Sequence, residues 1–336
     1  MKRILSMVMM IVITVTSFGF CSYNSNSVVS ADTVSWPSGP GLVAETAVMI
    51  DASTGSVLFD KKCHQKMYPA SITKIMTALL TIENCNLDDT VTFSQSAIDT
   101  LEPEAANIGA VVGEEMSVKD CLYALMLQSA NEVASALAEH VSGSIEEFAK
   151  LMNKRAKQAG ANDAHFANAC GLFNKKHYVT AYDMAKIMQA ALQYPVFREI
   201  INSSSYTLPT DNKRKEPLTI SQRHQMVQPW NSFHYDGIIG GKTGFVNESG
   251  TTLVTSAQRD GMTLITVVLN SPGTNSYVDT TALLDFGFKN FKFLFATKDA
   301  FIMVRNTLLY NILWIFVGAV FGITVAILFN EIQNKI

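Results

Sequence analysis

The stretch "YPASITKIMTALL", residues 68–80, has the pattern of a helix start near the beginning of a 336-residue chain. Ser71 and Lys74 are its two chemically unusual residues, and a spacing of three puts both on one helix face, about one turn apart. A serine hydroxyl becomes a good nucleophile when a base takes its proton, and a lysine of lowered pKa can be that base. A serine at this position is also a common N-cap. The stretch therefore predicts either a capped helix start or a nucleophile with its base.

Two further polar segments interrupt apolar surroundings. Ser129 and Asn131 break an apolar helical run, which indicates either a turn between helices or polar groups held in a cleft. Lys242, Thr243 and Gly244 fall in the strand-like run "GIIGGKTGFV". We expect a central strand there, in which lysine and glycine are unusual for packing, and a solvent-facing edge strand is the alternative. A phosphate loop is a poor explanation, because the glycine that this motif needs five residues earlier is missing.

The composition limits the class of protein and its partners. With 48% hydrophobic and 16% charged residues, the chain has the composition of a folded protein. The net charge of −3 and the lack of a basic run argue against a nucleic-acid partner. The spacings of Cys63, Cys85, Cys121 and Cys170 match no zinc pattern, so we expect neither a metal nor a cofactor. Cys121 lies in an apolar helical run and is expected to be buried, while the disulfide state stays open.

The two ends of the chain predict export and membrane attachment. Basic residues and an apolar run up to Phe20 predict a signal peptide over residues 1–31, with an uncleaved anchor as the alternative. A Pro/Gly/Ser-rich linker, 32–41, follows. The uncharged stretch 307–330 is long enough for a transmembrane helix, preceded by a juxtamembrane segment, 291–306, and followed by a short tail, 331–336. We therefore expect an exported, membrane-anchored protein whose main domain lies on the extracytoplasmic side.

The main domain, residues 42–290, has a pattern typical of an α+β fold. "ETAVMIDASTGSVLFDKKC" predicts a β-hairpin, and a helix is expected from Ser71 to about Glu83. "SIEEFAKLMNKRAKQAG" and "TAYDMAKIMQAAL" predict two more helices with N-terminal caps. After Pro195 the chain becomes rich in short strands, and "YVDTTALLDFGF" predicts a last helix. This order suits an antiparallel sheet that the first hairpin joins, flanked by helices together with a helical region.

Taken together, the three polar segments carry a resemblance to a known family. Ser-x-x-Lys, Ser-x-Asn and Lys-Thr-Gly occur in the order found in β-lactamases and penicillin-binding proteins. "QSANEVASALAEHVSGS", "HFANACGL", "HYVTAYDMA" and "GGKTGFVNESG" extend the likeness from about Ala44 to Phe288. The chain thus resembles the low-molecular-weight penicillin-binding proteins, which are serine-type D-Ala-D-Ala carboxypeptidases. This implies a penicillin-binding/β-lactamase-like transpeptidase fold that needs no cofactor. It also implies removal of the last D-alanine from peptidoglycan stem pentapeptides, and acylation by β-lactam antibiotics.

The resemblance assigns the catalytic roles residue by residue. It implies that Ser71 is the acylated nucleophile, that Lys74 is its base and that Ser129 passes a proton to the leaving amine. Asn131 matches the amide that grips the substrate backbone. Lys242 matches the residue that raises the positive potential and helps to keep Lys74 neutral.

The resemblance also assigns the residues that bind the substrate. Thr243 matches the group that binds the terminal carboxylate, and Gly244 allows a ligand to approach the backbone. The backbone N–H groups of Ser71 and Phe245 match an oxyanion hole. Arg223 loosely matches a basic residue that precedes the Lys-Thr-Gly strand in some members.

Three departures and three alternatives accompany this interpretation. Cys170 stands where relatives often carry Pro-His, residues 271–280 lack an arginine that some relatives have, and only residues 289–306 separate the domain from the apolar stretch.

A class A β-lactamase would need a Glu-x-x-Leu-Asn loop, but residues 160–180 contain no glutamate. The same acyl-enzyme also permits transpeptidation. A non-catalytic, membrane-tethered cell-wall binding protein is the alternative from another functional class.

Overall fold

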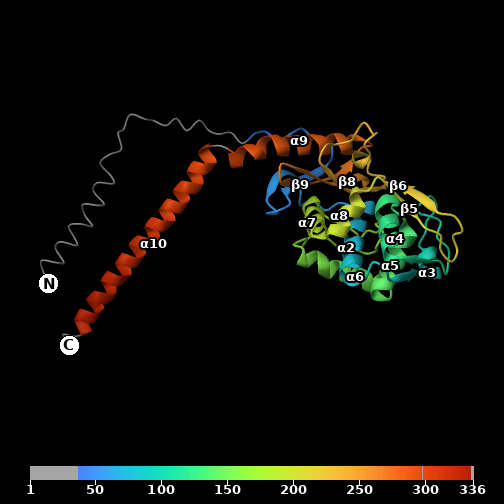
Figure 1. Ribbon diagram of the computed structural model, residues 1–336, viewed down its shortest axis with the longest axis horizontal. Helices are drawn as coiled ribbons and strands as arrows, with labels where there is room; N and C mark the ends of the chain where they lie inside the picture. Colours follow the sequence, from blue (N-terminus) through green and yellow to red (C-terminus); the bar gives the residue numbers. More distant parts are fainter. Residues whose placement is uncertain (1–36, 297, 334–336) are drawn as a thin grey trace. The chain divides into compact units, whose positions relative to one another are not determined.

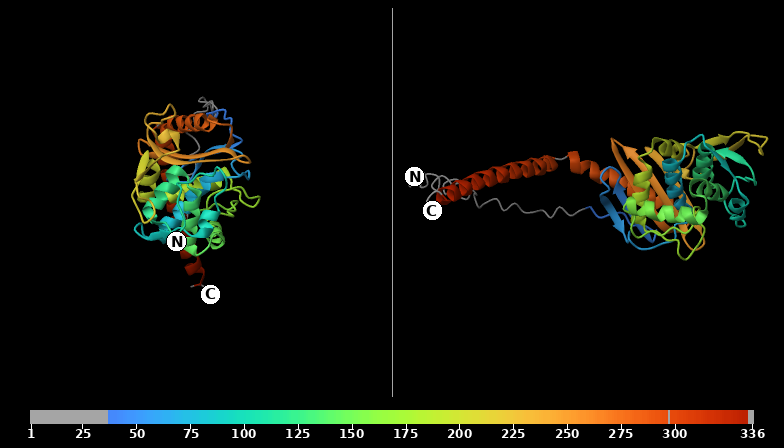
Figure 2. Two further views of the ribbon diagram at one scale, coloured as in Figure 1. Left: turned by 90° about the vertical axis from the view of Figure 1, so that its right-hand side faces the viewer. Right: turned by 90° about the horizontal axis from the view of Figure 1, so that it is seen from below.

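A five-stranded antiparallel sheet organises the protein. The computed structural model describes residues 37–296 and 298–333, so the predicted signal peptide, 1–31, lies outside the described residues. The strands follow the order β2-β1-β9-β8-β7. They are β1 Thr46–Asp51, β2 Val57–Lys61, β7 Ile238–Val246, β8 Gly250–Arg259 and β9 Met262–Ser271. The N-terminal hairpin pairs with β9, as predicted, and Figure 2 shows it in blue beside the orange strands from the other end of the domain.

Helices cover both faces of this sheet. One face carries α9, while the other is covered by α7 and α8 (Figure 1). These helices are α7 Ala181–Ala191, α8 Pro195–Asn202 and α9 Asn275–Ala296. Side chains alternate between the two faces along β1: Val48 and Ile50 enter the larger hydrophobic core, whereas Ala47 and Met49 enter the smaller core under α9. Because both faces are covered, β8 and β9 are long and almost wholly buried.

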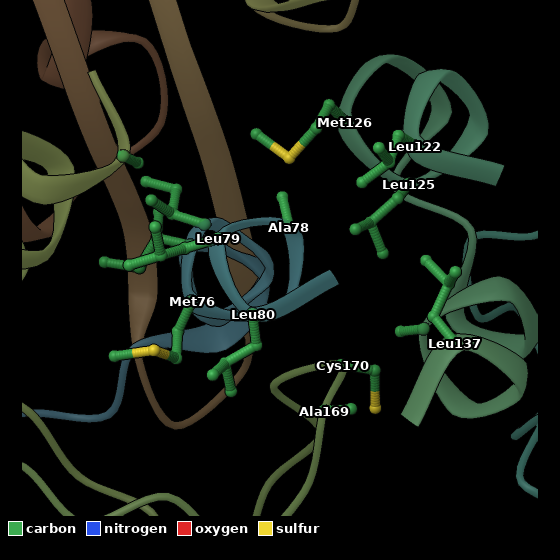
Figure 3. Close-up of a cluster of buried hydrophobic side chains, with 14 of the residues drawn as sticks. Met76, Ala78, Leu79, Leu80, Leu122, Leu125, Met126, Leu137, Ala169 and Cys170 are labelled. Atoms are coloured by element: carbon green, nitrogen blue, oxygen red, sulfur yellow. The ribbon is translucent and has the colours of Figure 1, made fainter. Parts of the chain in front are cut away.

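The chain between β2 and β7 forms a helical region, which continues into α7 and α8. Its helices are η1 Ala70–Thr73, α2 Lys74–Asn84, α3 Gln95–Asp99, α4 Val118–Tyr123, the π-helical turn η2 Ala124–Gln128, α5 Asn131–Ser142, α6 Ile145–Gln158 and η3 Gln225–Val227. Two small two-stranded antiparallel sheets complete it, made of β3 Thr90–Thr92 with β4 Glu115–Ser117, and β5 Ser205–Leu208 with β6 Leu218–Ser221. Figure 3 shows Leu122 and Leu125 from the α4–η2 segment and Leu137 from α5 on one side of α2. Residues Lys74–Thr81 of α2 are all buried, so packing holds the first two turns of this helix in place.

Several local predictions are confirmed by hydrogen-bonded caps. Thr180 and Asp183 form a reciprocal capping box at the start of α7, and the Ser144 side chain caps α6. Cys121 is fully buried, and Cys63, Cys85, Cys121 and Cys170 are free thiols.

Three local predictions need correction. The helix expected from Ser71 begins as the 3₁₀ turn η1, and α2 itself starts at Lys74. The segment after Pro195 was expected to be β-rich but opens with α8, because proline is well suited to the first turn of a helix. The strand carrying Lys242 was expected to be central but is the edge strand β7. It does not face solvent, since η1 and α8 pack against it and Lys242 is only 1% exposed.

The last helix is long and apolar. Helix α10, Lys298–Gln333, contains a candidate membrane span over Arg305–Asn330 with a mean hydropathy of 2.7. This span includes the predicted stretch 307–330, and its length and composition suffice to cross a bilayer. It is the one such helix among the residues that the structure describes.

Candidate active site

The side chain of Lys74 joins two of the three polar segments. It is fully buried at the start of α2, and its Nζ lies 3.0 Å from Ser71 Oγ and 2.6 Å from Asn131 Oδ1. A third contact, of 2.7 Å, goes to the backbone carbonyl of Cys170. Lys74 therefore contacts residues that are far apart in sequence, Asn131 and Cys170, as well as its neighbour Ser71.

Burial makes Lys74 a plausible base at neutral pH. Desolvation is the largest cause that lowers the pKa of Lys74, to about 8, and the charge of Arg223 adds to it. The nearby Cys170 and the buried Glu132 carboxylate act in the opposite direction. At pH 7 about a tenth of the lysine is thus neutral. Burial, followed by the charges of Lys74 and Arg223, also lowers the pKa of Lys242 well below its ordinary value.

Two non-glycine residues at the site have left-handed backbone conformations. Ala70, directly before Ser71, has φ 53°, and Ser129, in the turn between η2 and α5, has φ 65°. Such residues persist where surrounding contacts hold them, and they cluster at functional sites. One such contact is the hydrogen bond that Thr252 Oγ1 donates to the Pro69 carbonyl at 2.8 Å. The sequence patterns used above carry no signal for either conformation.

Two glycines let backbone segments close around Ser71. A Cβ on Gly244 would lie 2.4 Å from Thr252 Oγ1 and 2.9 Å from Ser71 N, so β7 closely approaches the main chain of Ser71. Gly171 has φ +92°, and a Cβ there would lie 1.9 Å from the Ala70 carbonyl oxygen. Only glycine fits at these two positions. The Lys-Thr-Gly motif predicted the importance of Gly244, whereas no motif pointed to Gly171, for which the glycine in "NACGL" was the available signal.

The predicted residues surround one cleft of about 670 Å³. Its walls include these predicted residues: Ser71, Ser129, Asn131, Arg223, Thr243, Gly244 and Phe245. Lys74 and Lys242 do not line the cleft and are fully or almost fully buried, and Lys242 Nζ donates to the Thr243 carbonyl at 3.0 Å. The structure thus brings all nine predicted site residues to the cleft or close to it.

The cleft also has walls that the motifs did not predict. Tyr277, on α9, lines it where the sequence lacks an arginine, and its hydroxyl lies 3.4 Å from the Arg223 carbonyl. The partly exposed rings of Phe173 and Phe245 form an apolar rim. Further wall residues are Glu102, Pro103, Glu104, Ala105, Ala106, Gly171, Leu172, Val246, Asn247, Glu248 and Thr251.

Comparisons with known proteins agree with this geometry. A family model described as D-alanyl-D-alanine carboxypeptidase, peptidase S11, matches residues 33–273. The D-alanyl-D-alanine carboxypeptidase DacF of Bacillus subtilis is 35% identical over 254 residues, which cover 74% of this chain and 63% of DacF. The matched region thus spans less than two thirds of that relative's length. DacB2 of Mycobacterium tuberculosis is 33% identical over 264 residues, 77% of this chain and 86% of DacB2.

Solved structures also resemble this protein. The crystal structure of the Streptomyces K15 DD-transpeptidase has a TM-score of 0.69 at 29% sequence identity. The match covers 75% of this chain and 99% of that one. The fold of three quarters of this chain therefore corresponds to nearly the whole of that DD-transpeptidase.

Proposed function

Because this chain belongs to the D-alanyl-D-alanine carboxypeptidase family of serine peptidases, we propose that it removes the terminal D-alanine from peptidoglycan stem pentapeptides. The reaction proceeds through an acyl-enzyme on Ser71, which β-lactams also form. One observation carries the proposal: the buried Lys74 amine lies within hydrogen-bonding distance of both Ser71 Oγ and Asn131 Oδ1.

The three contacts of Lys74 are those of an ammonium that donates to three oxygens, and they also fit the neutral amine, which is the form that acts as a base. Such an amine has two N–H groups, which it donates to Asn131 Oδ1 and the Cys170 carbonyl, at 2.6 and 2.7 Å. Its lone pair then faces Ser71 Oγ at 3.0 Å and can accept the hydroxyl proton. The Cys170 carbonyl therefore supports Lys74 although the residue at this position differs from that of many relatives, because the contact uses only the main chain.

Acylation follows from this arrangement. Ser71 Oγ attacks the carbonyl carbon of the penultimate D-alanine while its proton passes to Lys74. The carbonyl oxygen gains negative charge, which the backbone N–H groups of Ser71 and Phe245 stabilise. Ser129 then relays the proton to the nitrogen of the leaving D-alanine as the C–N bond breaks. Water attacks the ester in the second half-reaction, and Ser71 regains its proton.

Substrate binding uses the remaining predicted residues. The Asn131 carbonyl oxygen accepts from Lys74, which leaves the amide Nδ2 to donate to a substrate carbonyl in the cleft. Thr243 and Arg223, both in the cleft wall, bind the terminal carboxylate of the substrate, with the nearby Lys242 adding positive potential.

Attachment to the membrane forms part of the same proposal. A signal peptide over 1–31 directs export, and the catalytic domain spans 42–290 after the linker 32–41. The segment 291–306 then leads to a membrane helix over 307–330, with a short tail at 331–336. The candidate span in α10 supports the anchor, and stem peptides on the outer surface require the catalytic domain on the extracytoplasmic side.

Labelling with a fluorescent penicillin tests the proposal directly. We expect covalent labelling and D-alanine release from a pentapeptide by the wild type, and neither by Ser71→Ala. Ser53→Ala, in the exposed turn of the first hairpin, is the matched serine control and should behave as the wild type. Labelling retained in Ser71→Ala, or a wild type that neither labels nor releases D-alanine, would refute the acyl-enzyme. A wild type that is unlabelled but binds peptidoglycan would favour the non-catalytic alternative.

Product analysis separates the three enzymatic alternatives. Rapid turnover of penicillin would indicate a β-lactamase, whereas a long-lived adduct is expected of a carboxypeptidase. An amine acceptor added to the pentapeptide reaction would yield a new peptide bond if the enzyme worked chiefly as a transpeptidase.

A further inference from the structure

Helices α2 and α5 lie side by side and run in the same direction. Their first residues, Lys74 and Asn131, meet through the 2.6 Å hydrogen bond at the active site. At the opposite ends, Cys85 is the residue that caps α2, and His140 lies in the last turn of α5. Eleven residues of helix separate the two ends of α2, about 16 Å at 1.5 Å per residue. Contacts at the far ends therefore fix the same pair of helices that carries the catalytic lysine and asparagine.

Three metal-ligating groups gather at these far ends. The Sγ of Cys85, a carboxylate oxygen of Asp89 and a ring nitrogen of His140 all lie within 4.8 Å of one another. One thiol, one carboxylate and one imidazole form a set that zinc binds with its usual tetrahedral geometry, with water as the fourth ligand. Ligands of such a site are about 3.5 Å apart, so the three groups need to close by roughly an ångström.

The surroundings of the cluster favour an ordered yet accessible site. Asn86 orients the Asp89 carboxylate, through its backbone N–H at 2.8 Å and its side-chain amide at 3.3 Å. Such outer hydrogen bonds hold metal ligands in place. Cys85 and Asp89 are half-buried, whereas His140 is exposed, which leaves a path for an ion and freedom for the imidazole to move.

We propose that Cys85, Asp89 and His140 bind one zinc ion, which clamps the far ends of α2 and α5. The Cys85 thiol gives its proton to solvent as the zinc–sulfur bond forms. The role is structural, because none of the three residues lines the catalytic cleft. The cysteine spacing gave no zinc signal, since the ligands come from a loop after α2 and from a distant helix.

Zinc binding to the full-length protein tests this proposal. The purified chain is stripped with a chelator, titrated with zinc chloride alone by calorimetry, and analysed for bound metal after dialysis. We expect one zinc per wild-type chain and a higher melting temperature with zinc. Cys85→Ser and His140→Ala should lose this binding and the rise in melting temperature, and Asn86→Ala should bind about 10–100-fold more weakly. Cobalt in place of zinc should give a thiolate-to-cobalt charge-transfer band that Cys85→Ser lacks.

Matched variants keep the test decisive. Asp88→Asn, at an exposed neighbour outside the cluster, should bind zinc as the wild type does, whereas Asp89→Asn should not. Circular dichroism without metal shows whether each variant is folded, independently of enzymatic activity. A wild type that binds no zinc refutes the site, and so does equal binding by folded Cys85→Ser or His140→Ala.

Discussion

Replacing Gly244 by alanine is expected to damage acylation far more than folding. A Cβ at this position would lie 2.9 Å from Ser71 N, 3.0 Å from the Pro69 carbonyl and 2.4 Å from Thr252 Oγ1. Two of these neighbours are main-chain atoms, so β7 must move away by about 0.5–1 Å to restore contacts near 3.4 Å. The movement shifts Phe245 N–H, the proposed oxyanion donor, relative to Ser71.

The magnitude follows from the size of this displacement. A misplacement of about 1 Å can cost about 10²-fold in rate, and the loss of one oxyanion donor about 10²–10³-fold. The cost of overpacking to stability is only about 1–3 kcal/mol. We therefore expect an acylation rate constant at least about 100-fold lower, with a folded protein of modestly reduced melting temperature.

Stopped-flow labelling with a fluorescent penicillin measures the acylation rate constant, and thermal unfolding measures the stability. Gly41→Ala is the matched control, because a Cβ there meets nothing within 4 Å. If Gly244→Ala acylated within a few-fold of the wild-type rate, the close approach of β7 to Ser71 would not set the oxyanion geometry.

Three further predictions concern Lys74 and the buried imidazole of His177. Lys74→Arg should remain folded by circular dichroism yet fail to acylate, because a guanidinium keeps its proton; residual labelling near the wild-type rate would contradict a lysine base. The acylation rate of the wild type should rise with pH to a midpoint near 8, the lowered pKa of Lys74, and a profile flat from pH 6 to 9 would be inconsistent with that base. Burial lowers the pKa of His177 to about 3, so the folded protein favours the neutral imidazole. In the unfolded chain this histidine takes up a proton below about pH 6.5. The free energy of unfolding therefore falls by about 1.4 kcal/mol per pH unit from pH 6.5 down towards pH 3. Urea unfolding at pH 7 and pH 5 should show this slope, reduced in His177→Gln; an equal slope in both proteins would contradict it.

Much of the fold and of the site could be predicted because the signals were local or came as an ordered set. Two apolar runs joined by a turn predicted the first hairpin, and Thr180 with Asp183 predicted the start of α7. The three polar segments were ambiguous one at a time. Their order along the chain carried the family resemblance, which implied one site for Ser71, Lys74 and Asn131, and in the structure Lys74 lies within hydrogen-bonding distance of the other two.

The remainder depends on tertiary contacts that no local pattern encodes. The edge position of β7 follows from pairing between strands far apart in the chain, so the burial of Lys242 on an edge strand could not be predicted. The left-handed conformations of Ala70 and Ser129 come from neighbouring segments that hold them. Lys74 donates to the main-chain carbonyl of Cys170, and every residue type has such a carbonyl, so the sequence gives no signal for this contact.

The burial of Lys74 also has a consequence for the energetics of folding. A lysine of ordinary pKa in the unfolded chain enters a site where its pKa is about 8, so at pH 7 most folded chains still hold a buried ammonium. At pH 7 this transfer costs the folded state on the order of 3 kcal/mol, a large share of the stability of a typical domain. Between about pH 8 and pH 10.5 the unfolded chain binds more protons at this lysine than the folded protein does, so the free energy of unfolding rises with pH in this range. The protein therefore keeps a lysine of lowered pKa beside Ser71 at the expense of its own stability, and the burial of apolar side chains in the two hydrophobic cores must offset that cost before any substrate binds.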